Sequence, residues 1–150
     1  MEIIKSEKVL VYAFKTKATL NSMEQIVGES PKFIAQEIIK QNISIVGPQI
    51  WTYEGCNGNP DKEFVLNITF PVNKKGKDVN EFVFKELPAY KYVKKIHTGP
   101  YSDFPKIYES FMSQIIEAKL IPDNTNREIY LNCDFENQNN CIIEIQIGIV

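Results

Sequence analysis

The sequence predicts an α+β domain built from two copies of a strand-helix-strand-strand unit. Strand-like segments recur in the same order along the chain, first at 8–17, 49–54 and 64–72, then at 82–98, 128–133 and 141–150. A segment with helical spacing follows the first strand of each set. The two sets match at a constant offset of about 77 residues. We therefore expect one domain over 1–150, with half-repeats at about 8–72 and 82–149.

Both helical segments have an apolar stripe. The first spans 23–42 and is interrupted near Gly28, after which Ser30 and Pro31 are typical of a new helix start. The second begins at Ser102 or Asp103 and extends to about residue 119. Apolar side chains recur along it at three- and four-residue spacing: Phe104, Ile107, Phe111, Ile115 and Ile116. Each unit thus has a helix that can pack on its sheet.

The duplication predicts where a cleft forms. A helix covers one face of each unit, so the other face must be buried elsewhere. Two units related by a pseudo-two-fold axis can turn these faces toward a central cleft between antiparallel sheets, with the helices on the outer faces. Repeat-equivalent positions then line the cleft from both sides. Trp51 corresponds to Glu128, and Tyr53 corresponds to Tyr130.

Composition narrows the partners and the compartment. A formal net charge of −2 gives no basic footprint, so we expect no direct nucleic-acid binding. There is no run of about 18 apolar residues and no signal peptide, so we expect no membrane span. Cys56, Cys133 and Cys141 are odd in number and lack CxxC spacing. Reduced thiols in a cytoplasmic protein are the expectation.

Metal and triad chemistry are not supported. His97 is the only histidine, and no cluster of metal-ligating residues surrounds it in the sequence. The Gly-x-Ser-x-Gly motif of serine hydrolases and phosphate-binding glycine loops are also missing from the sequence. We expect no metal and no cofactor.

Three segments resemble a known family. His97–Tyr101, Arg127–Leu131 and Ile143–Ile147, taken in order, are similar to the GyrI-like small-molecule-binding domain, which is also the effector domain of multidrug-responsive transcription regulators. The resemblance covers nearly the whole chain. It implies the duplicated fold, a ligand cleft with aromatic walls, and a buried glutamate at Glu128. Gly148 stands where the family usually has proline, which puts the end of the last strand in doubt.

The predicted ligand-binding residues are those of the cleft and its neighbours: Trp51, Tyr53, Tyr92, Tyr101, Glu128 and Tyr130. Simpler interpretations remain open for each. Glu128 could be a solvated strand carboxylate, Trp51 and the tyrosines could be ordinary packing, and Tyr101 could anchor the turn that precedes the second helix. Pro88 obscures the strand register at Tyr92.

The leading hypothesis is binding of a small aromatic or cationic compound, with Glu128 as the acidic group. A rival follows from the resemblance, because some standalone members are similar to hydrolases that open strained cyclopropane rings of alkylating compounds. In that case Glu128 would be the general base, and thus the catalytic residue. A third hypothesis is a protein-protein inhibitor resembling the gyrase inhibitor, which would require a protein partner.

Overall fold

A computed structural model describes residues 1–133 and 136–150. In this part of the chain, eight antiparallel strands form one sheet in the order β1-β6-β8-β7-β3-β4-β2-β5. The strands are β1 (Ile4–Ser6), β2 (Val9–Ala18), β3 (Gln49–Glu54), β4 (Phe64–Pro71), β5 (Phe82–Leu87), β6 (Tyr90–Thr98), β7 (Pro122–Asn132) and β8 (Ile142–Ile149). The helices are α1 (Met23–Val27), α2 (Ser30–Lys40) and α3 (Phe104–Glu117), with 3-10 turns η1 (Tyr101–Asp103) and η2 (Gln138–Asn140).

The predicted duplication is confirmed. The first unit is β2-α2-β3-β4 and the second is β6-α3-β7-β8. Their strands follow mirrored orders from the middle of the sheet outward, β3-β4-β2 on one side and β7-β8-β6 on the other. The remaining strands are exchanged, because β1 pairs with β6 of the second unit and β5 pairs with β2 of the first. Each exchanged strand covers what would otherwise be an open sheet edge.

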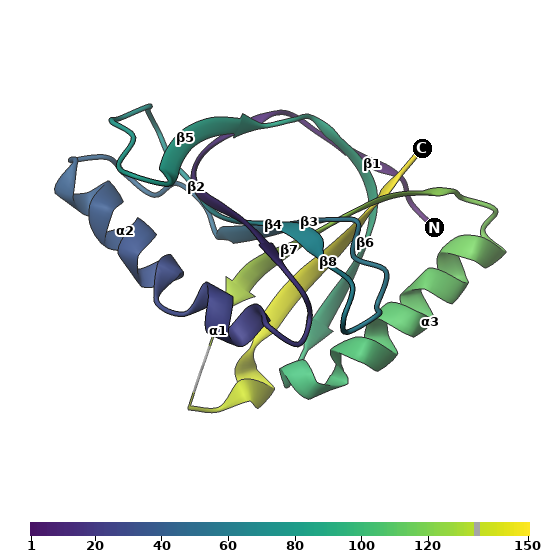
Figure 1. Cartoon of the computed structure of the whole chain (residues 1–150). Helices are drawn as coiled ribbons and strands as arrows, with labels where there is room; N and C mark the ends of the chain where they lie inside the picture. Colours follow the sequence, from purple (N-terminus) through teal and green to yellow (C-terminus); the bar gives the residue numbers. More distant parts are fainter. Residues whose placement is uncertain (134–135) are drawn as a thin grey trace.

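Both units place their helix on the same face of the common sheet (Figure 1). Ile34 and Ile38 of α2 are fully buried in a cluster with strand residues such as Ile68. Phe111 and Ile115 of α3 occupy a second cluster with alternate residues of β8: Ile143, Ile145 and Ile147. The apolar stripe of each helix therefore packs against the inward-facing residues of its own strands, which gives two separate cores, one in each unit. Burial of these side chains fixes the helices on either side of the sheet's centre.

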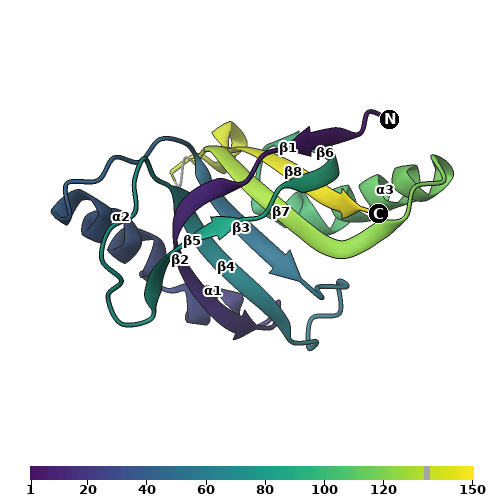
Figure 2. The same ribbon diagram turned by 90° about the horizontal axis from the view of Figure 1, so that it is seen from above.

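The opposite face of the sheet is covered by its own curled edges. In Figure 1, β2 and β5 on one side and β6 on the other arch away from the helices, and Figure 2 views the strands from that side. Val11, Ala13, Ile50 and Leu87 form a third buried cluster there, with Ile129 packed against it. Ile129 of β7 thus faces the curl of the sheet and not a helix.

This arrangement corrects one detail of the expected geometry. We expected the helices on outer faces, away from the cleft. Instead, a cavity of about 1610 Å³ lies on the helix-bearing face, and residues of α1, α2 and α3 form its walls. The reason is that the two helices pack over the outer strands of each unit and leave the central pair β3–β7 uncovered between them.

The observed elements differ from the sequence expectations in small ways. Strand β1 was not expected, and β7 begins at Pro122, with a register irregularity before Asn126. Helix α2 begins at Ser30 itself, with Glu29 in the N-cap position. The loop expected at 135–140 begins with a residue outside the described part. No helix among the described residues is long and apolar enough to cross a membrane.

Candidate functional site

The junction of the two units is the pairing of β3 with β7. Trp51 lies directly opposite Glu128 in this register, so the repeat-equivalent residues are also cross-strand partners. The pseudo-two-fold axis therefore passes between them. Tyr53 and Tyr130, also repeat equivalents, lie on the same face of these strands as Glu128, each two residues from the central pair. The duplication thus gathers an indole, two phenols and a carboxylate at one point of the sheet.

Glu128 is buried and accepts hydrogen bonds from three tyrosines. Only 4% of the Glu128 surface is exposed to solvent. The hydroxyls of Tyr53 and Tyr130 both donate to Oε1 at 2.8 Å. The hydroxyl of Tyr108, on α3, donates to Oε2 at 2.6 Å. Three phenol donors can stabilise an ionised carboxylate without placing a positive charge beside it.

The protonation behaviour of the cluster follows from this burial. Loss of solvent raises the pKa of Glu128, while the hydrogen bonds from Tyr108, Tyr53 and Tyr130 lower it, and burial prevails. Burial, followed by the negative charge of Glu128, raises the pKa of each of these three tyrosines well above its ordinary value. The phenols therefore keep their protons and remain donors wherever Glu128 is ionised.

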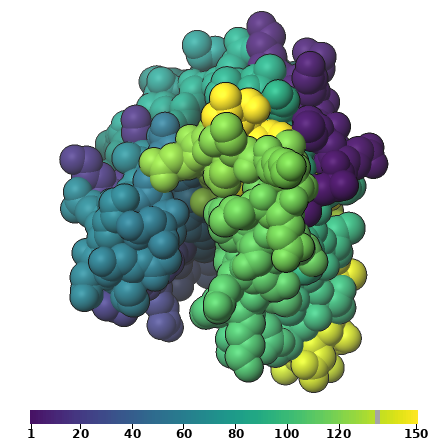
Figure 3. All heavy atoms as spheres, turned by 90° about the vertical axis from the view of Figure 1, so that its right-hand side faces the viewer, coloured from purple at the N-terminus to yellow at the C-terminus, as the bar shows by residue number. Residues whose placement is uncertain are grey.

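A cavity of about 1610 Å³ opens above this cluster. Its floor includes Trp51, Glu128 and Tyr130, and its walls include Phe104 and Tyr108 of α3 and residues of α1 and α2. The rings of Trp51 and Tyr130 are 5.1 Å apart and tilted. Figure 3 shows a furrow in the surface between the green atoms of α3 and the blue atoms of the segment that joins β3 to β4. The site is thus a concave space whose floor combines aromatic rings with a carboxyl group.

Five of the six predicted site residues line this cavity: Trp51, Tyr53, Tyr101, Glu128 and Tyr130. Tyr92, the sixth, does not line it. Its neighbour Val93 packs in the α3 core, so alternation turns Tyr92 to the opposite face of the sheet. There it stacks on Tyr90 at 5.5 Å, and Arg127 lies 4.0 Å from the centre of the Tyr90 ring.

Sequence reasoning missed Tyr108. It follows Phe104 by four residues and precedes Phe111 by three, so helical spacing places it on the same side as the apolar stripe. A phenol directed at the sheet must find a hydrogen-bond partner when it is buried. That requirement was the available signal, but the partner could not be identified without the position of α3 over β7.

Asn126 and Gln49 were also missed. They are repeat equivalents on the floor of the cavity, on either side of the central pair. The Asn126 amide nitrogen donates to the Tyr108 hydroxyl at 3.0 Å. The Gln49 amide oxygen accepts from the Trp51 indole nitrogen at 2.6 Å. Each amide therefore holds the aromatic side chain of its own half.

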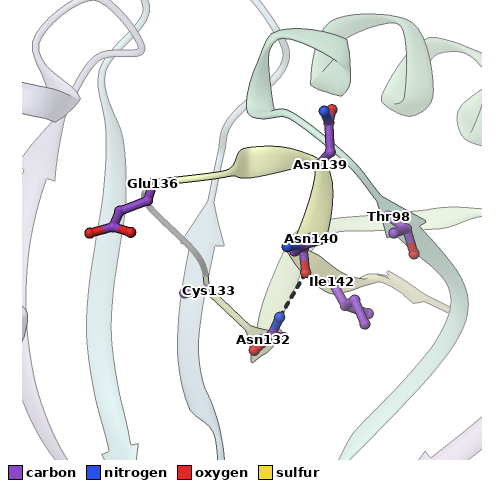
Figure 4. Close-up of a pocket in the computed structure, with 7 residues that line it drawn as sticks. All are labelled: Thr98, Asn132, Cys133, Glu136, Asn139, Asn140 and Ile142. Atoms are coloured by element: carbon purple, nitrogen blue, oxygen red, sulfur yellow. Dashed lines mark hydrogen bonds between the residues drawn. The ribbon is translucent and has the colours of Figure 1, made fainter.

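A second hollow, of about 740 Å³, lies at the end of the β7–β8 hairpin (Figure 4). Its lining is mostly exposed polar side chains, and the Asn132 amide donates to the Asn140 carbonyl at 2.7 Å across it. Figure 4 shows Glu136 directed away from the other lining residues. No buried charge of the described chain converges on this hollow, so it is the weaker candidate.

No group of three or more potential metal ligands occurs among residues 1–133 and 136–150. No disulfide joins Cys56, Cys133 or Cys141, which all belong to the described part of the chain, and Cys56 and Cys133 border the main cavity. Burial raises the pKa of both thiols, so they are poor thiolate ligands near neutral pH.

The fold and site define a class of protein: a duplicated α+β module with a large cavity over an aromatic floor and a buried acid. The family model of the GyrI-like small-molecule-binding domain matches residues 1–150. The chain therefore belongs to the GyrI-like small-molecule-binding family. A comparison with curated proteins found no match.

Solved structures show the same fold. The C-terminal domain of EcmrR is 20% identical, with a TM-score of 0.81 over 99% of this chain and 96% of that chain. In the complex of EcmrR with DNA, the match spans 56% of the longer chain. SAV2435 bound to tetraphenylphosphonium is 11% identical, with a TM-score of 0.65 over 99% and 93%. A hydrolase from Listeria innocua is 13% identical, with a TM-score of 0.68 over 99% and 91%.

Proposed function

We propose that this chain binds bulky aromatic cations in the cavity above Glu128. The observation that supports this most directly is the buried carboxylate itself. It accepts three phenol hydrogen bonds and forms no ion pair with any described residue, so its negative charge is not neutralised. A cation that enters the cavity would supply the missing charge.

The surroundings of Glu128 favour the same ligand class. Aromatic faces attract cations, and the indole of Trp51 is the strongest of them. The cavity is also bordered by Glu24, Glu29 and Glu109 against a single lysine, Lys32. The excess of carboxylates produces a negative potential that concentrates cations at the mouth. A protein of the same fold, SAV2435, has been solved with the aromatic cation tetraphenylphosphonium.

The test is a fluorescence titration, because Trp51 is the single tryptophan and lies in the cavity. Tetraphenylphosphonium should quench or shift its emission saturably. Triphenylphosphine oxide, a neutral compound with three of the same rings, should bind much more weakly. Equal affinity for the two compounds, or no saturable signal with either, would reject a cation site.

A second candidate function is hydrolysis of a strained electrophilic ring. It is favoured by the raised pKa of Glu128, which suits a general base near neutral pH, and by the free acceptor position left on Oε2. Glu128 would take a proton from water while the water oxygen forms a bond to one ring carbon. The C–C bond of the three-membered ring breaks, and its electron pair passes to an electron-withdrawing group conjugated with the ring, which then takes up the proton. Proteins of this fold include a hydrolase from Listeria innocua.

This candidate is tested by incubating the protein with a cyclopropane-bearing alkylating compound and measuring the hydrated, ring-opened product. Turnover should exceed that of a Glu128→Gln variant. Product formation no faster than with the variant excludes catalysis and leaves binding alone. The hypothesis of a protein partner is not tested by any observation of the chain and stays a prediction.

A further inference from the structure

The hydroxyl of Tyr108 forms two hydrogen bonds at once. It donates to Glu128 Oε2 at 2.6 Å, and it accepts from Asn126 Nδ2 at 3.0 Å. A phenol has one proton, so that proton can point to only one of its two partners. The amide N–H of Asn126 occupies the acceptor side of the oxygen and leaves the carboxylate as the direction for the proton.

The opposite orientation of the amide would be incompatible with this arrangement. If the Asn126 carbonyl oxygen faced Tyr108, two acceptors would compete for one phenol proton. The observed orientation leaves no such conflict. Asn126 also comes from β7 while Tyr108 comes from α3, so this contact fixes the helix side chain to the cavity floor.

We propose that Asn126 is a positioning residue, which directs the Tyr108 hydroxyl at Glu128 and thereby holds the carboxylate in the ionised form that a cation requires. This inference rests on the proposed function. It deepens that function by naming a residue that acts on the acid through another side chain, since the amide of Asn126 donates to the hydroxyl of Tyr108 and not to Glu128.

The two halves of the cavity provide an internal comparison. Gln49 is the repeat equivalent of Asn126 and also carries an amide on the cavity floor. It bonds to Trp51 instead, and α2 places Pro31, and not a phenol, at the position equivalent to Tyr108. A matched change at Gln49 therefore alters the same amide chemistry without touching the path from Asn126 through Tyr108 to Glu128.

Several ionisable groups surround Glu128. Tyr53 of β3, Tyr130 of β7 and Tyr108 of α3 bond to it, and Cys56 of the β3–β4 loop faces it. The charged groups that border the cavity are Glu24, Glu29, Lys32 and Glu109. All of these except Tyr108 are unchanged in the variants below, so their contribution to the pH profile is common to every protein compared.

The experiment measures tetraphenylphosphonium affinity against pH for the wild type, Asn126→Leu, Tyr108→Phe and the double variant. Loss of the Tyr108 donor should raise the pH at which half the affinity is lost by roughly one unit. Asn126→Leu should raise this pH midpoint by about half as much, because the Tyr108 hydroxyl can then rotate away from Glu128 for part of the time. Added to Tyr108→Phe, it should raise the midpoint no further. Gln49→Leu should leave the midpoint in place.

The outcomes separate this inference from the proposed function. Failure of the wild type to bind the cation rejects the proposed function. Normal binding with an unchanged midpoint in Asn126→Leu, or equal shifts with and without the Tyr108 hydroxyl, overturns the positioning role alone. Thermal melting checks that each variant folds. If leucine prevents folding, Asn126→Val provides the same test, because valine suits a strand and has no side-chain hydrogen-bond donor.

Discussion

Replacement of Glu128 by glutamine is the most informative single change. Glutamine has nearly the same shape, and its carbonyl oxygen can still accept from Tyr53 and Tyr130, so the fold should persist. What disappears is the buried negative charge. The phenol shell keeps a bulky cation about 6 Å or more from the carboxylate, where Coulomb's law at an effective dielectric constant of about 20 gives roughly 3 kcal/mol.

That energy corresponds to about a hundredfold loss of affinity, since each 1.4 kcal/mol is about a factor of ten. Isothermal titration calorimetry with tetraphenylphosphonium measures it directly. Triphenylphosphine oxide is the control ligand, and its weaker binding should be almost unaffected by Glu128→Gln. Equal cation affinity in the two proteins would refute the reasoning, because it would mean that aromatic contact alone holds the ligand.

Three further predictions follow from the same geometry. Cation affinity should be constant above the raised pKa of Glu128 and fall about tenfold per unit as pH drops below it, while neutral-ligand affinity should not change; fluorescence titrations at several pH values measure both. Trp51→Leu should weaken cation binding by about 1–2 kcal/mol, measured by calorimetry, and an unchanged affinity would remove the indole from the site. Gly148→Ala should lower the free energy of unfolding, measured with urea, by about 1–3 kcal/mol, because the new Cβ would lie 2.4 Å from Asp123 Oδ1. That oxygen accepts hydrogen bonds from the backbone and the hydroxyl of Thr125, which hold it in place. A variant as stable as wild type would show that Asp123 moves freely.

Gly148 also illustrates how a departure from the family pattern acquires a physical cause. In the sequence it was only a position where proline is usual. In the structure, the early start of β7 brings Asp123 and Thr125 against the backbone of β8 at this point. Only a residue without a side chain fits beside them, so the end of β8 retains its pairing with β6 through Tyr92.

The positions of the Tyr92 and Tyr108 side chains show what local sequence patterns cannot predict. Alternation in β6 is visible in the sequence, yet Pro88 hides which face is inward, and only Val93 packed against α3 settles it. The phenol of Tyr108 belongs to α3, and Tyr108 lies 20 residues before Glu128 in the sequence. Its contact with Glu128 depends on how α3 crosses the sheet, which no spacing along the chain encodes.

The sequence by itself determined the duplication, the two amphipathic helices and the correspondence of Trp51 with Glu128, because each of these follows from periodicity along the chain. Tertiary structure alone decided which face of the sheet holds the cavity. Two helices packed over the outer strands leave the junction of β3 and β7 open between them, so the cavity lies on the helix-bearing face. On the opposite face, Ile129 of β7 packs against residues of the curled sheet edge, although the pattern of one strand would suggest that it packs against a helix. Long-range packing of this kind also decided that Glu128 receives a third phenol, from Tyr108.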